Sequence, residues 1–292
     1  MNVLIYGAGV IGSVYATKLA ASGIDVSVYA RSARLNALNT KGLLYMEKNE
    51  LKKAKIKIVE KVKDTDKFDY VFVTIRYEQV ETVLHELKNN VSKNIVTFVN
   101  NPKGYQNWEK IVGTGRIIPA FAGAGGEIKE DILIYRLTPK MVQPTTFGEI
   151  NGVKSKRVNK LAQMMKTAKI PYSISKNMDA WQKSHLAMVT VLANGIYLDG
   201  GDNYSTAKNK WAIHEMSLAF KRNFRLLEAK GYPITPFKLK VFLICPTRLM
   251  EFLLKSMMNT KFSEIFINSH AQKAKSEMLL LSKDFLANII ET

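Results

Sequence analysis

Cysteine and histidine are scarce in this chain of 292 residues. The single cysteine, Cys245, cannot form an intrachain disulfide framework, and it fits a reducing compartment. The four histidines and this cysteine show none of the spacings that are typical of metal sites, so we expect no bound metal. These scarcities exclude the small disulfide-rich secreted proteins and the zinc-binding modules.

Long hydrophobic runs are also missing. No apolar stretch approaches the roughly 18 residues that a membrane-spanning helix needs, although the apolar fraction of 47% is that of a globular protein. The first apolar run, residues 2–6, leads directly into a glycine-rich segment, so we expect no signal peptide. The sequence therefore predicts a cytoplasmic protein that does not bind a membrane.

Acidic residues are few, since 25 Asp and Glu stand against 43 Lys and Arg and give a formal net charge of +18. A basic chain can bind nucleic acid. Here the basic residues are scattered at helix and strand spacing, without a separate block of like charge or interleaved aromatic residues. We therefore expect no specific nucleic-acid partner, although the positive field would attract a phosphorylated cofactor and a carboxylate substrate.

The most informative stretch is the beginning of the chain. A predicted strand at residues 2–6 leads into a Gly-x-Gly-x-x-Gly segment, then a predicted helix at 13–22 and a second strand at 25–30. This arrangement is typical of a dinucleotide site, in which Gly7 permits a tight turn, Gly9 lets a pyrophosphate approach the backbone, and Gly12 lets the helix pack on the sheet. A purely structural glycine turn is the alternative. The predicted cofactor-binding residues of this loop are Gly7, Ala8, Gly9, Val10, Ile11 and Gly12.

The end of the second predicted strand bears on the choice of cofactor. An NAD site usually has Asp or Glu there, to bind the ribose 2′-hydroxyl. This chain has Arg31, with Arg34 just beyond, and the nearby acid Asp25 lies at the start of the strand. A guanidinium can pair with a 2′-phosphate, so the sequence predicts NADP(H) rather than NAD(H). A solvated surface arginine is the alternative.

The order of the predicted elements divides the chain in two. Strands and helices alternate over residues 1–175, and helices alone are predicted over 176–292. This order predicts an α/β Rossmann-type domain with a mostly parallel sheet, followed by an all-α domain that holds the substrate. Within the first domain, 133–138 and 145–149 are predicted to form a late hairpin. Arg76 and Asn100 follow two core strands, at the edge where parallel sheets bind ligands.

Several further motifs accompany the glycine loop. They are Ala30-Arg31, Val73-Thr74-Ile75-Arg76, Asn100, Phe147-Gly148-Glu149, Trp181-Gln182-Lys183 and Lys275-Ser276-Glu277. With these motifs the chain resembles the ketopantoate reductase family, of the 6-phosphogluconate-dehydrogenase-like group, over nearly its whole length. The resemblance implies NADPH-dependent reduction of a 2-keto acid to a 2-hydroxy acid, most directly of 2-dehydropantoate to pantoate in pantothenate and CoA biosynthesis.

The resemblance also implies roles for individual residues. The lysine that matches Lys183 binds the substrate and donates the proton to its carbonyl oxygen, and the asparagine that matches Asn100 contacts cofactor and substrate. The glutamate that matches Glu277 contributes to both, and the position of Arg76, usually lysine, touches the cofactor. The chemistry agrees, because hydride addition builds negative charge on oxygen and requires a cation with a transferable proton. A solvated surface charge is the alternative for Lys183 and for Glu277.

The substrate is left open by two departures from the family pattern. Ala187 and Val191 stand where the resemblance leads us to expect polar substrate-binding residues. Three functions are therefore compatible with the sequence: reduction of ketopantoate, reduction of another small carbonyl compound, and non-catalytic sensing of NADP(H). Apolar surface on the helical domain is compatible with a homodimer.

Overall fold

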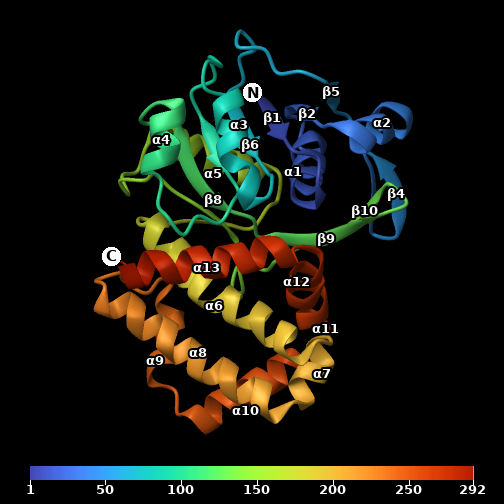
Figure 1. Cartoon of the computed structure of the whole chain (residues 1–292). Helices are drawn as coiled ribbons and strands as arrows, with labels where there is room; N and C mark the ends of the chain where they lie inside the picture. Colours follow the sequence, from blue (N-terminus) through green and yellow to red (C-terminus); the bar gives the residue numbers. More distant parts are fainter. Residues whose placement is uncertain (292) are drawn as a thin grey trace. The chain divides into compact units, whose positions relative to one another are not determined.

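The computed structural model describes residues 1–291, which form two compact units. Unit 1 comprises Met1–Val99 and Tyr105–Met178, and unit 2 comprises Asn100–Gly104 and the chain from Asp179 onward. The predicted fold class is confirmed, since a mostly parallel sheet with helices occupies the first part of the chain and helices alone the last part (Figure 1). No helix within residues 1–291 is long and apolar enough to cross a membrane.

An eight-stranded sheet forms the centre of unit 1 (Figure 1). Its strands are β1 (Asn2–Tyr6), β2 (Asp25–Tyr29), β5 (Lys57–Val59), β6 (Tyr70–Val73), β7 (Ile95–Thr97), β8 (Ile117–Phe121), β11 (Thr145–Phe147) and β12 (Tyr172–Ile174). The order is β12-β11-β8-β7-β6-β1-β2-β5, and the six strands from β8 to β5 are parallel. β11 runs antiparallel to β8. The central strands are continuous apolar runs because helices cover both of their faces.

Helices lie on both faces of this sheet and create two apolar cores. α1 (Val10–Ala21) and α5 (Lys156–Thr167) pack in the first core, and α3 (Val80–Glu86) and α4 (Gln106–Val112) in the second. Residues of β1 alternate between the cores, with Val3 and Ile5 in the first and Leu4 and Tyr6 in the second. The remaining helices of unit 1 are α2 (Ser32–Lys41) and the short η1 (Tyr77–Gln79).

The predicted late hairpin is wrong. A second sheet in the order β4-β3-β10-β9 contains β3 (Leu44–Glu47), β4 (Glu50–Lys53), β9 (Ala124–Lys129) and β10 (Ile132–Leu137), whereas β11 joins the large sheet (Figure 1). The true partner of β10 is β9, across a turn in which Glu130 and Asp131 have φ of 51° and 68°. Turns with positive φ usually contain Asn or Gly, and Glu130-Asp131 lacks both, so the sequence pattern did not predict a turn here.

Unit 2 is built from helices (Figure 1). They are α6 (Met178–Asp199), α7 (Asn203–Lys208), α8 (Lys210–Ala229), η2 (Phe237–Lys240), α9 (Val241–Ile244), α10 (Thr247–Met258), α11 (Lys261–Ser263), η3 (Glu264–Asn268), α12 (Ser269–Lys273) and α13 (Lys275–Glu291). The 22-residue α6 supplies much of the core, and Leu186, Ala187, Val191 and Ile196 are all buried. Ala187 and Val191 therefore have a packing role that polar residues could not fill without partners.

His185 is a buried titratable group on α6. Its ring stacks on Trp181, with 5.4 Å between the ring centroids and 9° between the planes. Burial, and to a smaller extent repulsion from His270, lower the pKa of His185 to about 3. The imidazole is therefore neutral at physiological pH, which suits a packing role.

This burial predicts a dependence of stability on pH. In the unfolded chain, His185 binds a proton once the pH falls below its ordinary pKa of about 6.5. In the native state it stays unprotonated until the pH is near 3. The native state is therefore most stable relative to the unfolded state above pH 6.5 and loses stability as the pH falls from 6.5 to 3. Between pH 7 and pH 5 we expect His185 to account for a loss of about 2 kcal/mol in unfolding free energy. Urea unfolding at both pH values should show a smaller loss for His185→Gln.

The exposed His85 provides the matched control, since His85→Gln should retain the wild-type pH dependence. Equal pH dependence of wild type and His185→Gln would contradict the assignment.

Candidate functional site

The glycine loop has the backbone geometry of a dinucleotide site. Gly7 has φ of +112°, and a Cβ there would lie 2.8 Å from the carbonyl oxygen of Thr74. A Cβ on Gly12 would lie 1.9 Å from the carbonyl oxygen of Gly7. Gly9, the N-cap of α1, has extended backbone, and a Cβ there would meet no atom within 4 Å. Two glycines are thus required by packing, and the third leaves the backbone open to a ligand.

Thr74 and Arg34 fix this loop, a role that the sequence analysis did not assign. The Thr74 hydroxyl, just beyond β6, donates to the carbonyl oxygen of Gly7 at 2.8 Å. From α2, Nε of Arg34 donates to the carbonyl oxygen of Ala8 at 3.1 Å, and burial lowers the pKa of this guanidinium while Asp131 opposes that shift. Nη1 of Arg34 is buried and has no hydrogen-bond partner within the described chain. A cation with an unused donor therefore lies against a loop suited to phosphates.

Arg31 is the second residue after β2, near the end of the strand as predicted, and it pairs with the acid Glu86. Its Nη2 donates to Oε1 and Oε2 of Glu86 at 2.7 and 2.5 Å, and to the Tyr6 hydroxyl at 2.9 Å. Its Nε donates to the Tyr29 hydroxyl at 2.6 Å. The bonds to Glu86 and then to Tyr29 raise the pKa of Arg31, and Tyr6 also donates to Glu86. The acid that the sequence lacks at the end of β2 thus comes from α3, 55 residues downstream of Arg31.

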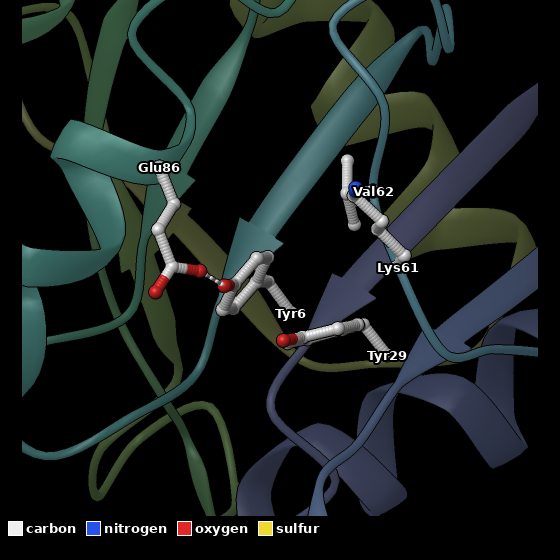
Figure 2. A pocket seen from close by; sticks show the side chains of 5 residues that line it. All are labelled: Tyr6, Tyr29, Lys61, Val62 and Glu86. Carbon is white, nitrogen blue, oxygen red and sulfur yellow. Dashed lines mark hydrogen bonds between the residues drawn. The ribbon is translucent and has the colours of Figure 1, made fainter.

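A cavity of about 280 Å³ lies in this region of unit 1. It is lined by Tyr6, Tyr29, Lys61, Val62 and Glu86, as Figure 2 shows. The rings of Tyr6 and Tyr29 lie with their centroids 4.4 Å apart, and the Glu86 carboxylate points at the Tyr6 hydroxyl (Figure 2). Tyr6 and Tyr29 are the last residues of β1 and β2, so the cavity lies at the carboxyl edge of the sheet, where ligands of this architecture bind.

Arg76 is exposed and is the N-cap of η1, two residues beyond Thr74. Its carbonyl oxygen accepts a hydrogen bond from the amide of Gln79 at 3.0 Å. It therefore lies after β6, on the same edge of the sheet as the glycine loop that follows β1.

Lys183 lies in the second turn of α6 and is buried, with a side chain only 5% exposed. Its ammonium pairs with Asp179, one helical turn earlier, and lies 4.6 Å from the centroid of the Tyr232 ring. The Asp179 side chain is 33% exposed. A buried ammonium requires a counter-charge, and the carboxylate with the aromatic face supplies it. Lys183 is therefore not the solvated surface lysine that the sequence also allowed.

Asn100 belongs to the same unit as Lys183, because the loop Asn100–Gly104 clusters with unit 2. The amide of Asn101 donates to Oε1 of Gln182 at 2.9 Å, which ties the loop to the residue before Lys183. The Asn101 side chain closes the loop by donating to the carbonyl oxygen of Gly104 at 2.6 Å. Oδ1 of Asn100 is buried and accepts no hydrogen bond from the described residues. An unsatisfied acceptor of this kind is a candidate contact for a ligand.

Glu277 is half-buried in the first turn of α13. A carboxylate is stabilised there by the helix dipole, which gives this acid a structural reason of its own. Among residues 1–291, no three His, Cys, Asp or Glu side chains come together as metal ligands.

Comparison with known proteins gives the family context. The model of the family described as "Ketopantoate reductase PanE/ApbA" matches residues 3–152. A 2-dehydropantoate 2-reductase of Mesorhizobium japonicum is 27% identical over 189 residues, which cover 56% of this chain and 57% of that protein. One of Pyrococcus abyssi is 28% identical over 181 residues, covering 62% and 58%. The matches thus span little more than half the length of these curated relatives.

A solved structure shows the same fold. The structure of D-mandelate dehydrogenase with NADH and anilino(oxo)acetate has a TM-score of 0.71, covers 100% of this chain and 99% of that chain, and is 17% identical. At this identity the similarity concerns the arrangement of the elements.

The glycine loop allows a paired substitution test. Gly9→Ala should fold like the wild type, because its Cβ has open space, but should weaken NADPH binding by about tenfold or more because the Cβ occupies the approach to the backbone. Gly12→Ala should destabilise unit 1 itself, because its Cβ would overlap the carbonyl oxygen of Gly7. Fluorescence titration with NADPH and thermal unfolding measure the two effects. Unchanged NADPH affinity in a folded Gly9→Ala variant would show that no dinucleotide approaches this loop.

Proposed function

Because this chain belongs to the ketopantoate reductase PanE/ApbA family, we propose that it is an NADPH-dependent reductase that converts a 2-keto acid to a 2-hydroxy acid. The first candidate reaction is 2-dehydropantoate to pantoate. The observation that carries the proposal is the buried Lys183 ammonium, held by Asp179, in a chain whose glycine loop is built for a dinucleotide. Burial of a lysine is unfavourable unless its charge is paired, and Lys183 is paired with Asp179. A buried, paired cation of this kind is a candidate for a functional site.

The cofactor would be held by residues of unit 1. The backbone from Gly7 to Gly12 and the N-terminus of α1 would bind the pyrophosphate, with Arg34 behind the loop. Arg31 and the N-terminus of the ten-residue α2, which begins at Ser32, supply positive charge for a 2′-phosphate. Arg76 completes the proposed contacts from unit 1. The resemblance to the family adds Asn100 and Glu277, which belong to unit 2. The bound cofactor supplies the hydride.

Lys183 acts on the other atom of the carbonyl group. As the carbon accepts hydride, its oxygen gains negative charge, and Nζ of Lys183 stabilises that charge and donates the proton. Asp179 pairs with the ammonium and would keep it oriented before the reaction. The buried Oδ1 of Asn100 can accept a hydrogen bond from the substrate or from the cofactor amide, which would fix the position of either.

A second candidate substrate is favoured by two positions on α6. Ala187 is 0% and Val191 4% exposed, so neither presents a polar group to a substrate. A 2-keto acid with an apolar side chain requires fewer hydroxyl contacts than ketopantoate. The structure of D-mandelate dehydrogenase, which has a similar fold, contains anilino(oxo)acetate. This ligand of the other protein supports the proposal of a 2-keto acid with an apolar side chain. A panel that includes ketopantoate, aliphatic 2-keto acids and phenylglyoxylate separates the two candidates.

Lys183→Ala tests the proton donor. We expect kcat to fall by about a hundredfold or more, because general acid catalysis contributes about 10² to 10⁴, while NADPH affinity remains that of the wild type. The measurement is NADPH oxidation with the keto acid panel, alongside fluorescence titration of NADPH. Lys208→Ala, an exposed lysine in the same unit, should have no effect. Turnover retained by Lys183→Ala would reject the assignment, and NADPH binding without turnover in the wild type would favour a non-catalytic sensor.

Asp179→Asn tests how the ammonium is positioned. The substitution preserves shape but removes the carboxylate partner of Lys183, so we expect kcat to fall by about tenfold with little change in KM for NADPH. Asp179→Glu, which restores the charge, should recover part of the loss. Equal kcat values for wild type and Asp179→Asn would show that the ammonium is positioned without this carboxylate.

A further inference from the structure

The cluster around Arg31 contains two features that bear differently on the cofactor. Arg31 is the cation expected for a 2′-phosphate, and Glu86 is an acid in contact with it, of the kind that NAD sites use for the ribose 2′-hydroxyl. Both side chains are partly exposed, Arg31 by 53% and Glu86 by 40%, so both are accessible to a ligand. The cavity lined by Glu86, Tyr6 and Tyr29 provides space for the ribose end of a dinucleotide beside the cluster.

The hydrogen bonds of Arg31 limit how it can bind a phosphate. Bidentate recognition uses two donors on one edge of the guanidinium. Nε already donates a hydrogen bond to the Tyr29 hydroxyl, and Nη2 donates to the Glu86 carboxylate and the Tyr6 hydroxyl. A 2′-phosphate must therefore displace Glu86 from Nη2 or approach through Nη1 alone.

Charge adds to this competition. A 2′-phosphate carries about −1.5 to −2 at neutral pH, and it would bind next to the Glu86 carboxylate. A ribose 2′-hydroxyl is neutral and can donate a hydrogen bond to the same carboxylate. Glu86 thus opposes the ligand group that distinguishes NADP(H) and favours the group that distinguishes NAD(H).

We propose that Glu86 sets the cofactor selectivity of this chain by competing with the 2′-phosphate for Arg31, so that NADPH and NADH bind with similar affinity. The inference rests on the dinucleotide site of the proposed function and changes only its selectivity. Lys61 also lines the cavity and is a further cation that a bound phosphate could contact.

Direct binding tests this proposal. Fluorescence titration of the full-length protein with NADPH and with NADH gives the affinity ratio, which we expect to lie within about tenfold in the wild type. Glu86→Gln removes the charge and keeps the size of the side chain, so NADPH affinity should rise by about tenfold and NADH affinity should stay equal or fall. Glu81→Gln, an exposed glutamate on the same helix, provides the control with the same change in net charge and should leave the ratio unchanged.

Arg31 must mediate the effect. In an Arg31→Gln background, Glu86→Gln should raise NADPH affinity much less than in the wild type, because the cation for which the carboxylate and the phosphate compete is gone and only the relief of repulsion remains. A ratio that is the same in wild type and Glu86→Gln, with both cofactors bound, would overturn the selectivity role and leave the proposed function intact. Failure of the wild type to bind either dinucleotide would overturn both.

Discussion

The close approach of α1 to β1 is the constraint on which the rest of unit 1 depends. A Cβ on Gly12 would lie 1.9 Å from the carbonyl oxygen of Gly7, so the helix reaches the sheet only because this position has no side chain. Thr74 and Arg34 then hold the loop from two sides, through the carbonyl oxygens of Gly7 and Ala8. Within the loop that these contacts hold, a Cβ on Gly9 would meet no atom within 4 Å, so its backbone is open to a ligand.

Acidic side chains pair with two of the cations that we assign to cofactor and substrate. Asp179 pairs with Lys183 in unit 2, and Glu86 pairs with Arg31 in unit 1. The chain has 25 acidic and 43 basic residues, so many cations have no acidic partner of their own, whereas Lys183 and Arg31 each have one. The consequences of the two pairings differ because of burial. The nearly buried Lys183 requires a partner for stability, whereas the half-exposed Arg31 could be solvated without one.

Local sequence patterns predicted the glycine loop, the alternation of strands and helices, and the class of fold. They did not predict which residues pair when the two partners are far apart in the sequence. The Glu86 carboxylate lies 55 residues from Arg31 in sequence, whereas Asp25 is the only acid near the end of β2 in the local sequence. The hairpin of β9 and β10 escaped for a different reason, because its turn uses Glu130 and Asp131 rather than Asn and Gly. Asn101 had no role assigned from the sequence, yet its side chain closes the loop that carries Asn100.

By itself the sequence determined the glycine spacing, the succession of α/β and helical parts, and the presence of a lysine after Trp181, because these depend on neighbouring residues and on the periods of helices and strands. Only the tertiary structure decided that Lys183 is buried against Asp179 and Tyr232, and that Arg31 is bound to Glu86 and two tyrosines. The burial of Lys183 and the pairing of Arg31 with Glu86 depend on which distant segments the fold brings together, and no single stretch of the chain contains that information. The Lys183–Asp179 pair itself is local, because the two residues are one helical turn apart.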